Sequence, residues 1–262
     1  MADPAFDEAP ALTLIDHLEE LRRRLLRSLI AVAVGMAGGW FASPYVLDWL
    51  IRITVRHAVV LSPVEALFER FKLSLMLGAV FALPAIFYQV WAFVVPGLLR
   101  RERKLLLPLV VGSMALFAAG VALSLWVVTP IAIAALDVFL TPSMTAQFRL
   151  ADVLGFVYGL CLATGIVFQL PLVVAALTAL RVVSTRFLIR QWRLALVGAV
   201  VVSALVTPGD VVIAQLLLGI PLVALYALSV VVAWLIERSR GAEAREPALL
   251  DEWTRDTRGE NA

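Results

Sequence analysis

The segment "LALVGAVVVSALVTPGDVVIAQLLLGIPLVALYALSVVVAWLI", residues 194–236, runs for 43 residues with a single charged side chain, Asp210. A membrane-crossing helix needs about 20 apolar residues to cover a hydrocarbon core of roughly 30 Å, so this segment is too long for one crossing. The turn signal "TPGD", residues 207–210, interrupts it. The segment therefore predicts two short membrane helices joined by a tight hairpin.

Four more charge-free runs come earlier in the chain, at residues 28–47, 73–99, 105–136 and 153–180. A charge at the centre of a membrane helix costs about 2.5 to 3.5 kcal/mol, so long runs without charge indicate crossings. The chain of 262 residues is 62% hydrophobic and 16% charged, whereas a typical soluble domain is about 25% charged. We therefore predict an all-α polytopic membrane protein with six transmembrane helices, the fifth and sixth of them short.

Lysine and arginine predict the orientation of these crossings. Seventeen of the 22 basic residues fall on one side, in clusters within residues 22–27, 100–104, 181–193 and 238–258. Because basic residues concentrate in cytoplasmic loops, both termini are expected in the cytoplasm. The predicted organisation is a cytoplasmic N-terminal segment (1–27), a six-helix transmembrane domain (28–236) and a cytoplasmic tail (237–262), which we expect to be disordered because it is polar and of mixed charge.

The N-terminal segment contains "HLEELRRRL", residues 17–25. Thr13 and Asp16 fit a capping box, and leucines then recur at helical spacing. We expect an amphipathic helix that lies on the cytoplasmic membrane surface before the chain turns into the membrane. Its many acidic residues argue against a cleaved signal peptide. Glu20 either pairs with Arg24 one turn later or binds a ligand.

Three other acidic positions stand out. Glu102 is the single acid among four bases in "LLRRERKLL", residues 98–106, where it either relieves the positive charge or binds a ligand. Asp210 either caps the sixth helix or belongs to a site. On the opposite side, "SPVE" (residues 62–65) predicts a helix start outside the membrane, with Glu65 off the apolar face of an amphipathic extension. That extension either packs on its neighbours or docks a partner.

Several classes of function find no support in the sequence. His17 and His57 fall on opposite predicted sides of the membrane, and the single cysteine, Cys161, lies in an apolar run. No phosphate loop or metal-ligand spacing is present, so we expect neither an enzyme nor a cofactor. A net charge of +2 does not indicate nucleic-acid binding. The middle of the spans lacks Asp, Glu, Lys and His, which disfavours a proton relay.

Four motifs, in order along the chain, carry a resemblance to a known family. They are "HLEELRRRL" (17–25), "FYQVWAFVVPGLLRRER" (87–103), "FQLP" (168–171) and "LVTPGD" (205–210). Together, over about residues 12–236, they strongly resemble TatC, the multispanning core and signal-peptide receptor of the twin-arginine protein translocase. The resemblance implies a glove-shaped protein of six helices with both ends in the cytoplasm.

The resemblance also implies site residues. It assigns Glu20, Arg22 and Glu102 to signal-peptide binding and places Phe93 near the same surface. Thr207, Asp210 and Gln215 would belong to a region around the fifth helix that docks the single-span partners TatA or TatB or has a structural role. The family often has glutamate where this chain has Gln169, so a polar hydrogen-bonding role is expected there.

The resemblance makes the ligand role of Glu20 and Glu102 the expected one. Two consecutive arginines present two planar guanidinium groups, each suited to bidentate pairing with a carboxylate, and lysine cannot reproduce that fork. The expected protein is a non-enzymatic receptor and scaffold that exports folded cargo across a prokaryotic cytoplasmic (inner) membrane, as part of a hetero-oligomer surrounded by lipid. The alternatives are a small-solute secondary transporter built on proline-broken helices and, more remotely, an intramembrane enzyme.

Overall fold

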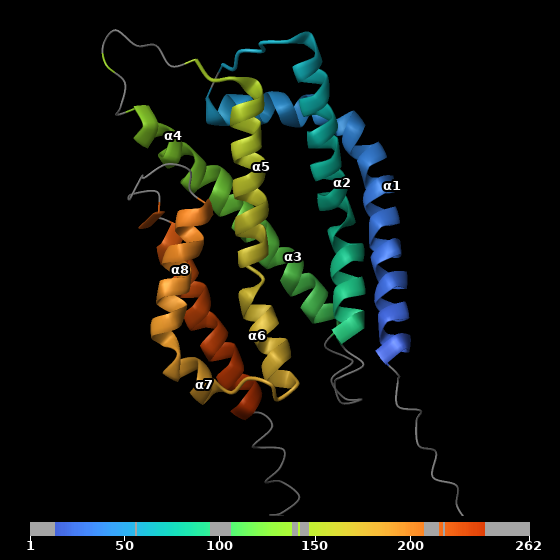
Figure 1. Ribbon diagram of the computed structural model, residues 1–262, viewed down its shortest axis with the longest axis vertical. Helices are drawn as coiled ribbons and strands as arrows, with labels where there is room; N and C mark the ends of the chain where they lie inside the picture. The colour runs from blue at the N-terminus through green and yellow to red at the C-terminus, as the bar shows by residue number, and fades with distance from the viewer. Residues whose placement is uncertain are drawn as a thin grey trace, which may run out of the picture. The chain divides into compact units, whose positions relative to one another are not determined.

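The computed structural model describes residues 14–55, 57–94, 106–137, 141, 147–206, 215–216 and 218–238. Within them the chain is helical apart from short turns and one isolated bridge between Val59 and Arg149, which confirms the all-α prediction. The elements in order are α1 (Leu14–Thr54), α2 (Pro63–Val94), α3 (Leu106–Leu123), a π-helix (Ser124–Val128), α4 (Thr129–Asp137), α5 (Leu150–Val167), α6 (Leu170–Ala179), α7 (Thr185–Arg190), α8 (Trp192–Val206) and a last helix, Leu218–Arg238 (Figure 1).

Five of the described helices are long and apolar enough to cross a membrane: Ile15–Thr54, Pro63–Val94, Leu106–Ala135, Leu150–Ala179 and Leu218–Arg238. A shorter apolar helix, Trp192–Ala204, occupies the predicted fifth crossing. These last two are the shortest of the six, as expected, although 21 residues suffice for a full crossing. Six crossings and cytoplasmic termini remain predictions. The "TPGD" turn and most of the predicted tail, from residue 239 on, lie outside the described residues.

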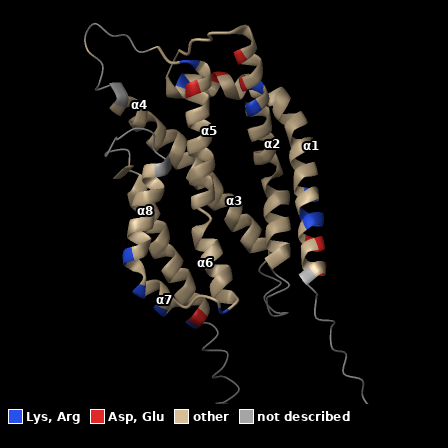
Figure 2. Ribbon diagram, viewed as in Figure 1, with Lys and Arg blue, Asp and Glu red and all other residues tan. Residues whose placement is uncertain are grey.

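Helix α1 corrects one prediction. We expected the N-terminal amphipathic helix to lie flat and the chain then to turn, but residues 14–54 form one continuous helix. The physical reason is that no glycine or proline interrupts residues 14–34, so nothing stops the helix at the charge boundary. The leucines of the amphipathic part are exposed, with Leu18 at 64% and Leu25 at 66%. The charged turns of α1 therefore extend directly from the apolar ones (Figure 2).

The chain divides into two compact units, each of which is described by itself. Unit 1 comprises Met1–Val46 and Arg70–Val110, and unit 2 comprises Leu47–Glu69 and Val111–Ala262.

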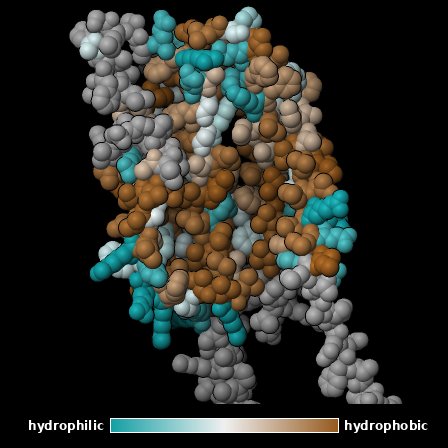
Figure 3. Space-filling view, in the orientation of Figure 1, coloured by the Kyte–Doolittle hydropathy of each residue, from teal (hydrophilic) through white to brown (hydrophobic). Residues whose placement is uncertain are grey.

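The hydrophobic side chains lie along the middle of the helices and the hydrophilic ones toward their ends (Figure 3). This is the pattern expected of helices that cross a membrane.

In unit 1, α1 and α2 pack along a seam of small residues. A Cβ placed on Gly35 would lie 2.5 Å from the carbonyl oxygen of Gly78, and one on Gly39 would lie 2.6 Å from that of Ser74. Residues four apart on each helix thus let the two backbones approach closely, the small-xxx-small packing of membrane helices. At the end of the seam the Arg70 side chain donates to Ser43 Oγ at 3.2 Å. The seam sets an antiparallel register between α1 and α2.

In unit 2, α3 packs on α5 and α6, and Gln169 lies where α5 ends. Its Nε2 group donates to the carbonyl oxygens of Ser113 (3.2 Å) and Gly165 (3.3 Å). Pro171 follows in the first turn of α6, where its missing N–H interrupts the helical ladder. The Gln169 amide therefore ties the break between α5 and α6 to α3. Buried apolar side chains form the core beside it: Val128, Leu160, Phe168, Leu218, Leu222 and Leu225.

The first turns of α2, also in unit 2, show which side of this predicted extension is buried. The apolar side chains are exposed (Val64 52%, Phe68 61%), whereas Glu65 and Glu69 are buried at 7% and 1%. The Glu65 carboxylate accepts hydrogen bonds from the Arg149 side chain and from the backbone N–H groups of Leu61 and Ala151. The helix therefore packs on its neighbours through its acidic side, where the Glu65 carboxylate finds donors inside the protein.

Candidate functional site

The charged end of α1 holds two Glu–Arg pairs at the same i,i+4 spacing but in different surroundings. Glu19 and Arg23 are 3.6 Å apart, and their side chains are 66% and 65% exposed. Glu20 and Arg24 are closer, with side chains only 29% and 19% exposed. One pair is an ordinary surface pair, worth little in water, while the other is partly sheltered against α2.

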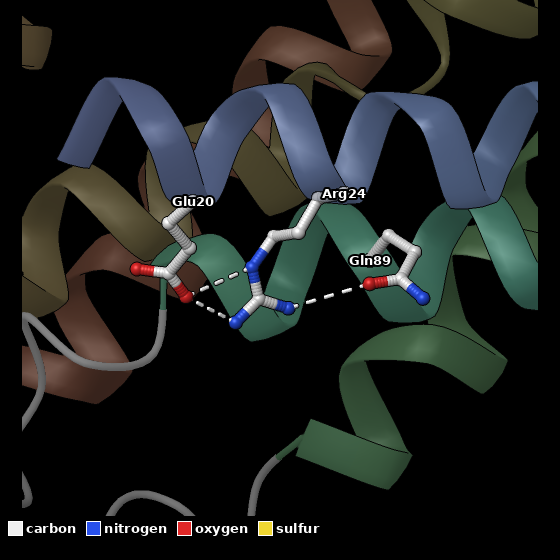
Figure 4. A network of polar contacts seen from close by, with 3 residues as sticks. All are labelled: Glu20, Arg24 and Gln89. Atoms are coloured by element: carbon white, nitrogen blue, oxygen red, sulfur yellow. Dashed lines mark hydrogen bonds and ion pairs between the residues drawn. The ribbon is translucent and has the colours of Figure 1, made fainter. Parts of the chain in front are cut away.

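The sheltered pair extends into a three-residue network (Figure 4). Arg24 donates to Glu20 Oε1 through Nε at 3.0 Å and through Nη2. Its Nη1 donates to Gln89 Oε1 on α2 at 3.4 Å. In Figure 4 the second oxygen of Glu20 points away from this network. The guanidinium group thus bridges a carboxylate of α1 and an amide of α2.

A ring contact one turn away completes this face. The rings of His17 and Phe93 are stacked, with centroids 4.3 Å apart and planes at 25°. His17 precedes Glu20 by three residues and Phe93 follows Gln89 by four, so both contacts lie along one antiparallel face of α1 and α2. Phe93, which the family resemblance placed near the site, is therefore within one helical turn of the Glu20 network.

A polar recess accompanies the network. It has a volume of about 410 Å³ and is lined by side chains of α1: Asp16, Glu19, Glu20, Arg23, Arg24 and Arg27. Three carboxylates and three guanidinium groups line it, so it suits a charged ligand. Arg22 is exposed on α1. Glu102, the other predicted carboxylate, lies outside the described residues.

Two participants went unrecognised as site residues in the sequence. The i,i+4 spacing predicts Arg24 as a partner of Glu20, and the structure confirms that pair. Gln89 is one of few polar side chains within a predicted span, but its contact with Arg24 joins positions 65 apart. The available signal was its rarity, because a polar side chain in a membrane helix usually has a partner or a function.

A second candidate feature lies in unit 2, between α8 and the last helix. It is an apolar groove of about 400 Å³, lined by Leu196, Ala199, Val200, Ser203, Gln215, Leu216, Gly219, Ile220 and Val223. Gln215 donates through Nε2 to the carbonyl oxygen of Val200 at 3.3 Å. Leu216 and Ile220 are 59% and 69% exposed. The groove thus offers a helix-sized apolar face with one amide at its edge. Thr207 and Asp210 lie outside the described residues.

Among the described residues, no group of His, Cys, Asp and Glu side chains could hold a metal ion. Cys161 is half-buried in α5, and its thiol contacts Ser124 Oγ at 3.5 Å. Two candidate functional features of the described residues are the carboxylate network of unit 1 and the apolar groove of unit 2.

Comparison with known proteins adds independent evidence. Residues 16–221 match the family model described as Sec-independent protein translocase protein (TatC). The chain is 33% identical over 257 residues to the TatC protein of Deinococcus radiodurans, covering 94% of this chain and 95% of that one. It is 36% identical over 243 residues to the chloroplastic TATC protein of Arabidopsis thaliana, covering 89% of this chain and 70% of that one.

Solved structures agree with the sequence relatives. A crystal structure described as the twin arginine translocase receptor TatC aligns with a TM-score of 0.72 and 32% identity, covering 83% of this chain and 99% of that one. A second crystal structure of the same description aligns with a TM-score of 0.70. The chain therefore belongs to the TatC family, the membrane proteins that serve as components of the Sec-independent, twin-arginine protein translocase.

Proposed function

We propose that this chain is the signal-peptide receptor and the scaffold of its translocase. It binds the twin-arginine signal peptides of folded cargo proteins at the cytoplasmic face of a prokaryotic inner membrane. Glu20 and Glu102 pair with the two arginines, and Arg22 and Phe93 complete the peptide surface. The same chain recruits single-span TatA and TatB subunits.

One observation supports the peptide site most strongly. Glu20 holds a guanidinium group through two N–H donors in a partly sheltered position (Figure 4). Charge-assisted hydrogen bonds from arginine are about twice as strong as neutral ones, and partial burial strengthens them further. A carboxylate that already binds one arginine in this way can bind another. Glu19, in a pair about two thirds exposed, has no comparable advantage.

The groove of unit 2 supports the scaffold role. A single-span partner presents an apolar helix, and helices associate in membranes through close packing and a few interhelical hydrogen bonds. The groove between α8 and the last helix offers apolar walls, with Ser203 and Gln215 as polar points. Thr207 and Asp210 belong to the same proposal because they follow α8 in the chain.

A binding experiment tests the receptor role. The full chain in lipid nanodiscs is titrated with a labelled twin-arginine signal peptide and with its twin-lysine version. We expect the arginine peptide to bind at least about tenfold more tightly, and Glu20→Gln and Glu102→Gln each to lose most of that preference. Asp48→Asn is the matched control, since Asp48 forms an exposed i,i+4 pair with Arg52 at the other end of α1. Equal binding of both peptides to the wild-type chain would refute the proposal.

A further inference from the structure

We propose that Arg24 is a built-in competitor for the incoming signal peptide: it occupies Glu20 in the empty receptor and leaves when an arginine of the peptide arrives. This inference rests on the proposed function, because it assumes that Glu20 is the carboxylate that the peptide uses. It goes further by assigning Arg24 and Gln89 the control of affinity and of selectivity for arginine over lysine.

The first argument is geometric. Both N–H groups that Arg24 gives to Glu20 converge on the same oxygen, Oε1. A bidentate arginine–carboxylate pair uses both oxygens with two parallel N–H bonds. An incoming guanidinium group therefore reaches one oxygen at most while Arg24 stays. Full pairing with the peptide requires Arg24 to move.

The second argument concerns what holds Arg24 in place. Gln89 Oε1, on the neighbouring helix α2, accepts a long hydrogen bond of 3.4 Å from Nη1, the remaining terminal nitrogen of Arg24. This contact reaches Arg24 without touching Glu20 (Figure 4). Gln89 therefore sets how firmly the competitor is held, and the carboxylate itself is left ready for exchange.

The third argument is selectivity. Exchange replaces one guanidinium pair with another of the same kind, so little free energy is gained from the pairing alone. A lysine ammonium group offers no planar fork and cannot replace two N–H donors in the same arrangement. Displacing Arg24 is thus harder for lysine than for arginine. The competitor lowers the affinity for every peptide and in return raises the discrimination, as expected where binding a wrong ligand has to be suppressed.

The test uses the full chain in nanodiscs and the labelled twin-arginine and twin-lysine peptides. We expect Arg24→Gln to bind the arginine peptide about tenfold more tightly and to reduce its preference over the lysine peptide. Gln89→Leu should act in the same direction with a smaller effect, since it only loosens Arg24. Arg23→Gln also removes one positive charge, from the neighbouring position. Its effect on peptide affinity shows how much of the change in Arg24→Gln comes from the loss of charge alone. Arg52→Gln, from the exposed pair with Asp48, should leave binding unchanged.

The outcomes separate this inference from the proposed function. If the wild-type chain shows no preference for the arginine peptide, the receptor role fails and the competitor role with it. If the preference is present and Glu20→Gln removes it, while Arg24→Gln and Gln89→Leu bind no more tightly than Arg23→Gln, only the competitor role is refuted. Binding by Arg24→Gln and Gln89→Leu as weak as that of Glu20→Gln would also refute it, because Arg24 would then be needed to position the carboxylate. Gln89→Leu keeps the test decisive if Arg24→Gln fails to fold.

Discussion

Glu20 in unit 1 and Glu65 in unit 2 are both glutamates that bind an arginine, and their surroundings give them opposite tasks. Glu20 has a partner four residues away that uses one oxygen, and its side chain is 29% exposed. Glu65 is 5% exposed and uses both oxygens. Oε1 accepts from Arg149 Nε at 3.0 Å and from the Ala151 N–H at 3.1 Å, and Oε2 accepts from the Leu61 N–H at 3.1 Å.

The difference lies in the kind of hydrogen-bond donor that each carboxylate has, a backbone N–H group or a side chain that can move. Ala151 lies in the first turn of α5, whose N-cap residue, Arg149, supplies no side-chain cap. Glu65 therefore satisfies a free N–H group at the start of a helix far along the chain, and its negative charge is stabilised by the helix dipole. Backbone donors cannot leave without local unfolding, whereas the side chain of Arg24 can rotate away. We infer that Glu65 is a latch, meaning a structural carboxylate that joins α2 to the start of α5, and that Glu20 is a site where one arginine can replace another.

Forcing α1 and α2 apart at their seam of small residues should reduce stability and peptide binding more than any other change. In Gly78→Leu the new side chain would meet the backbone of Met36, which lies 2.5 Å from a Cβ at that position. Backbone cannot yield as a flexible side chain can, so we expect a loss of at least about 1 to 3 kcal/mol of stability. Separation of α1 from α2 should also break the Arg24–Gln89 contact. Thermal melting and peptide binding in nanodiscs would measure both.

Gly155→Leu is the matched control for the seam. Gly155 lies in α5, and a Cβ there meets no atom within 4 Å. The same substitution should therefore leave the melting temperature within a few degrees of the wild-type value. A wild-type melting temperature for Gly78→Leu would mean that the close approach of α1 and α2 does not carry stability.

The latch is tested by Glu65→Gln. The amide keeps one acceptor oxygen, but its NH₂ group is itself a donor and cannot accept a hydrogen bond from the N–H groups that face it. At least one buried donor therefore loses its acceptor. We expect a clear drop in melting temperature, larger than that of Glu20→Gln, because the Glu20 pair is more exposed. Peptide affinity per folded molecule should not change. A larger drop for Glu20→Gln than for Glu65→Gln would overturn the distinction between latch and site.

Local spacing could predict part of these two sites. The i,i+4 spacing of Glu20 and Arg24 predicts their pair, and the structure contains it. The contacts that distinguish the sites join distant positions: Arg24 with Gln89, and Glu65 with Arg149 and Ala151. Such contacts depend on helix register and on backbone groups that carry no sequence signal. Their chemistry could not be predicted without the fold.

The apolar pattern predicted the helices well and their faces less well. Charge-free runs indicated every long apolar helix in the described part, because a charge in a membrane interior is costly. The exposed apolar side of α2 was harder to interpret, since in water Phe68 would turn inward and Glu65 outward. In the structure the burial is reversed, and the Glu65 carboxylate finds its donors within the protein. The spacing of apolar and charged residues therefore does not by itself decide which side of this helix is buried.

The smallest effect is expected from Arg149→Gln, which removes the charged partner from Glu65 and leaves its two backbone donors in place. The Arg149 side chain is 47% exposed, so solvent screens much of its attraction to the carboxylate. Its melting temperature should fall by less than half as much as that of Glu65→Gln. An equal fall in the two variants would show that the ion pair holds the latch, and Glu65 would then resemble Glu20 in depending on a side chain that can move. A small fall in melting temperature would show that Glu65 is held mainly by the N–H groups of Leu61 and Ala151, which a competing arginine cannot replace.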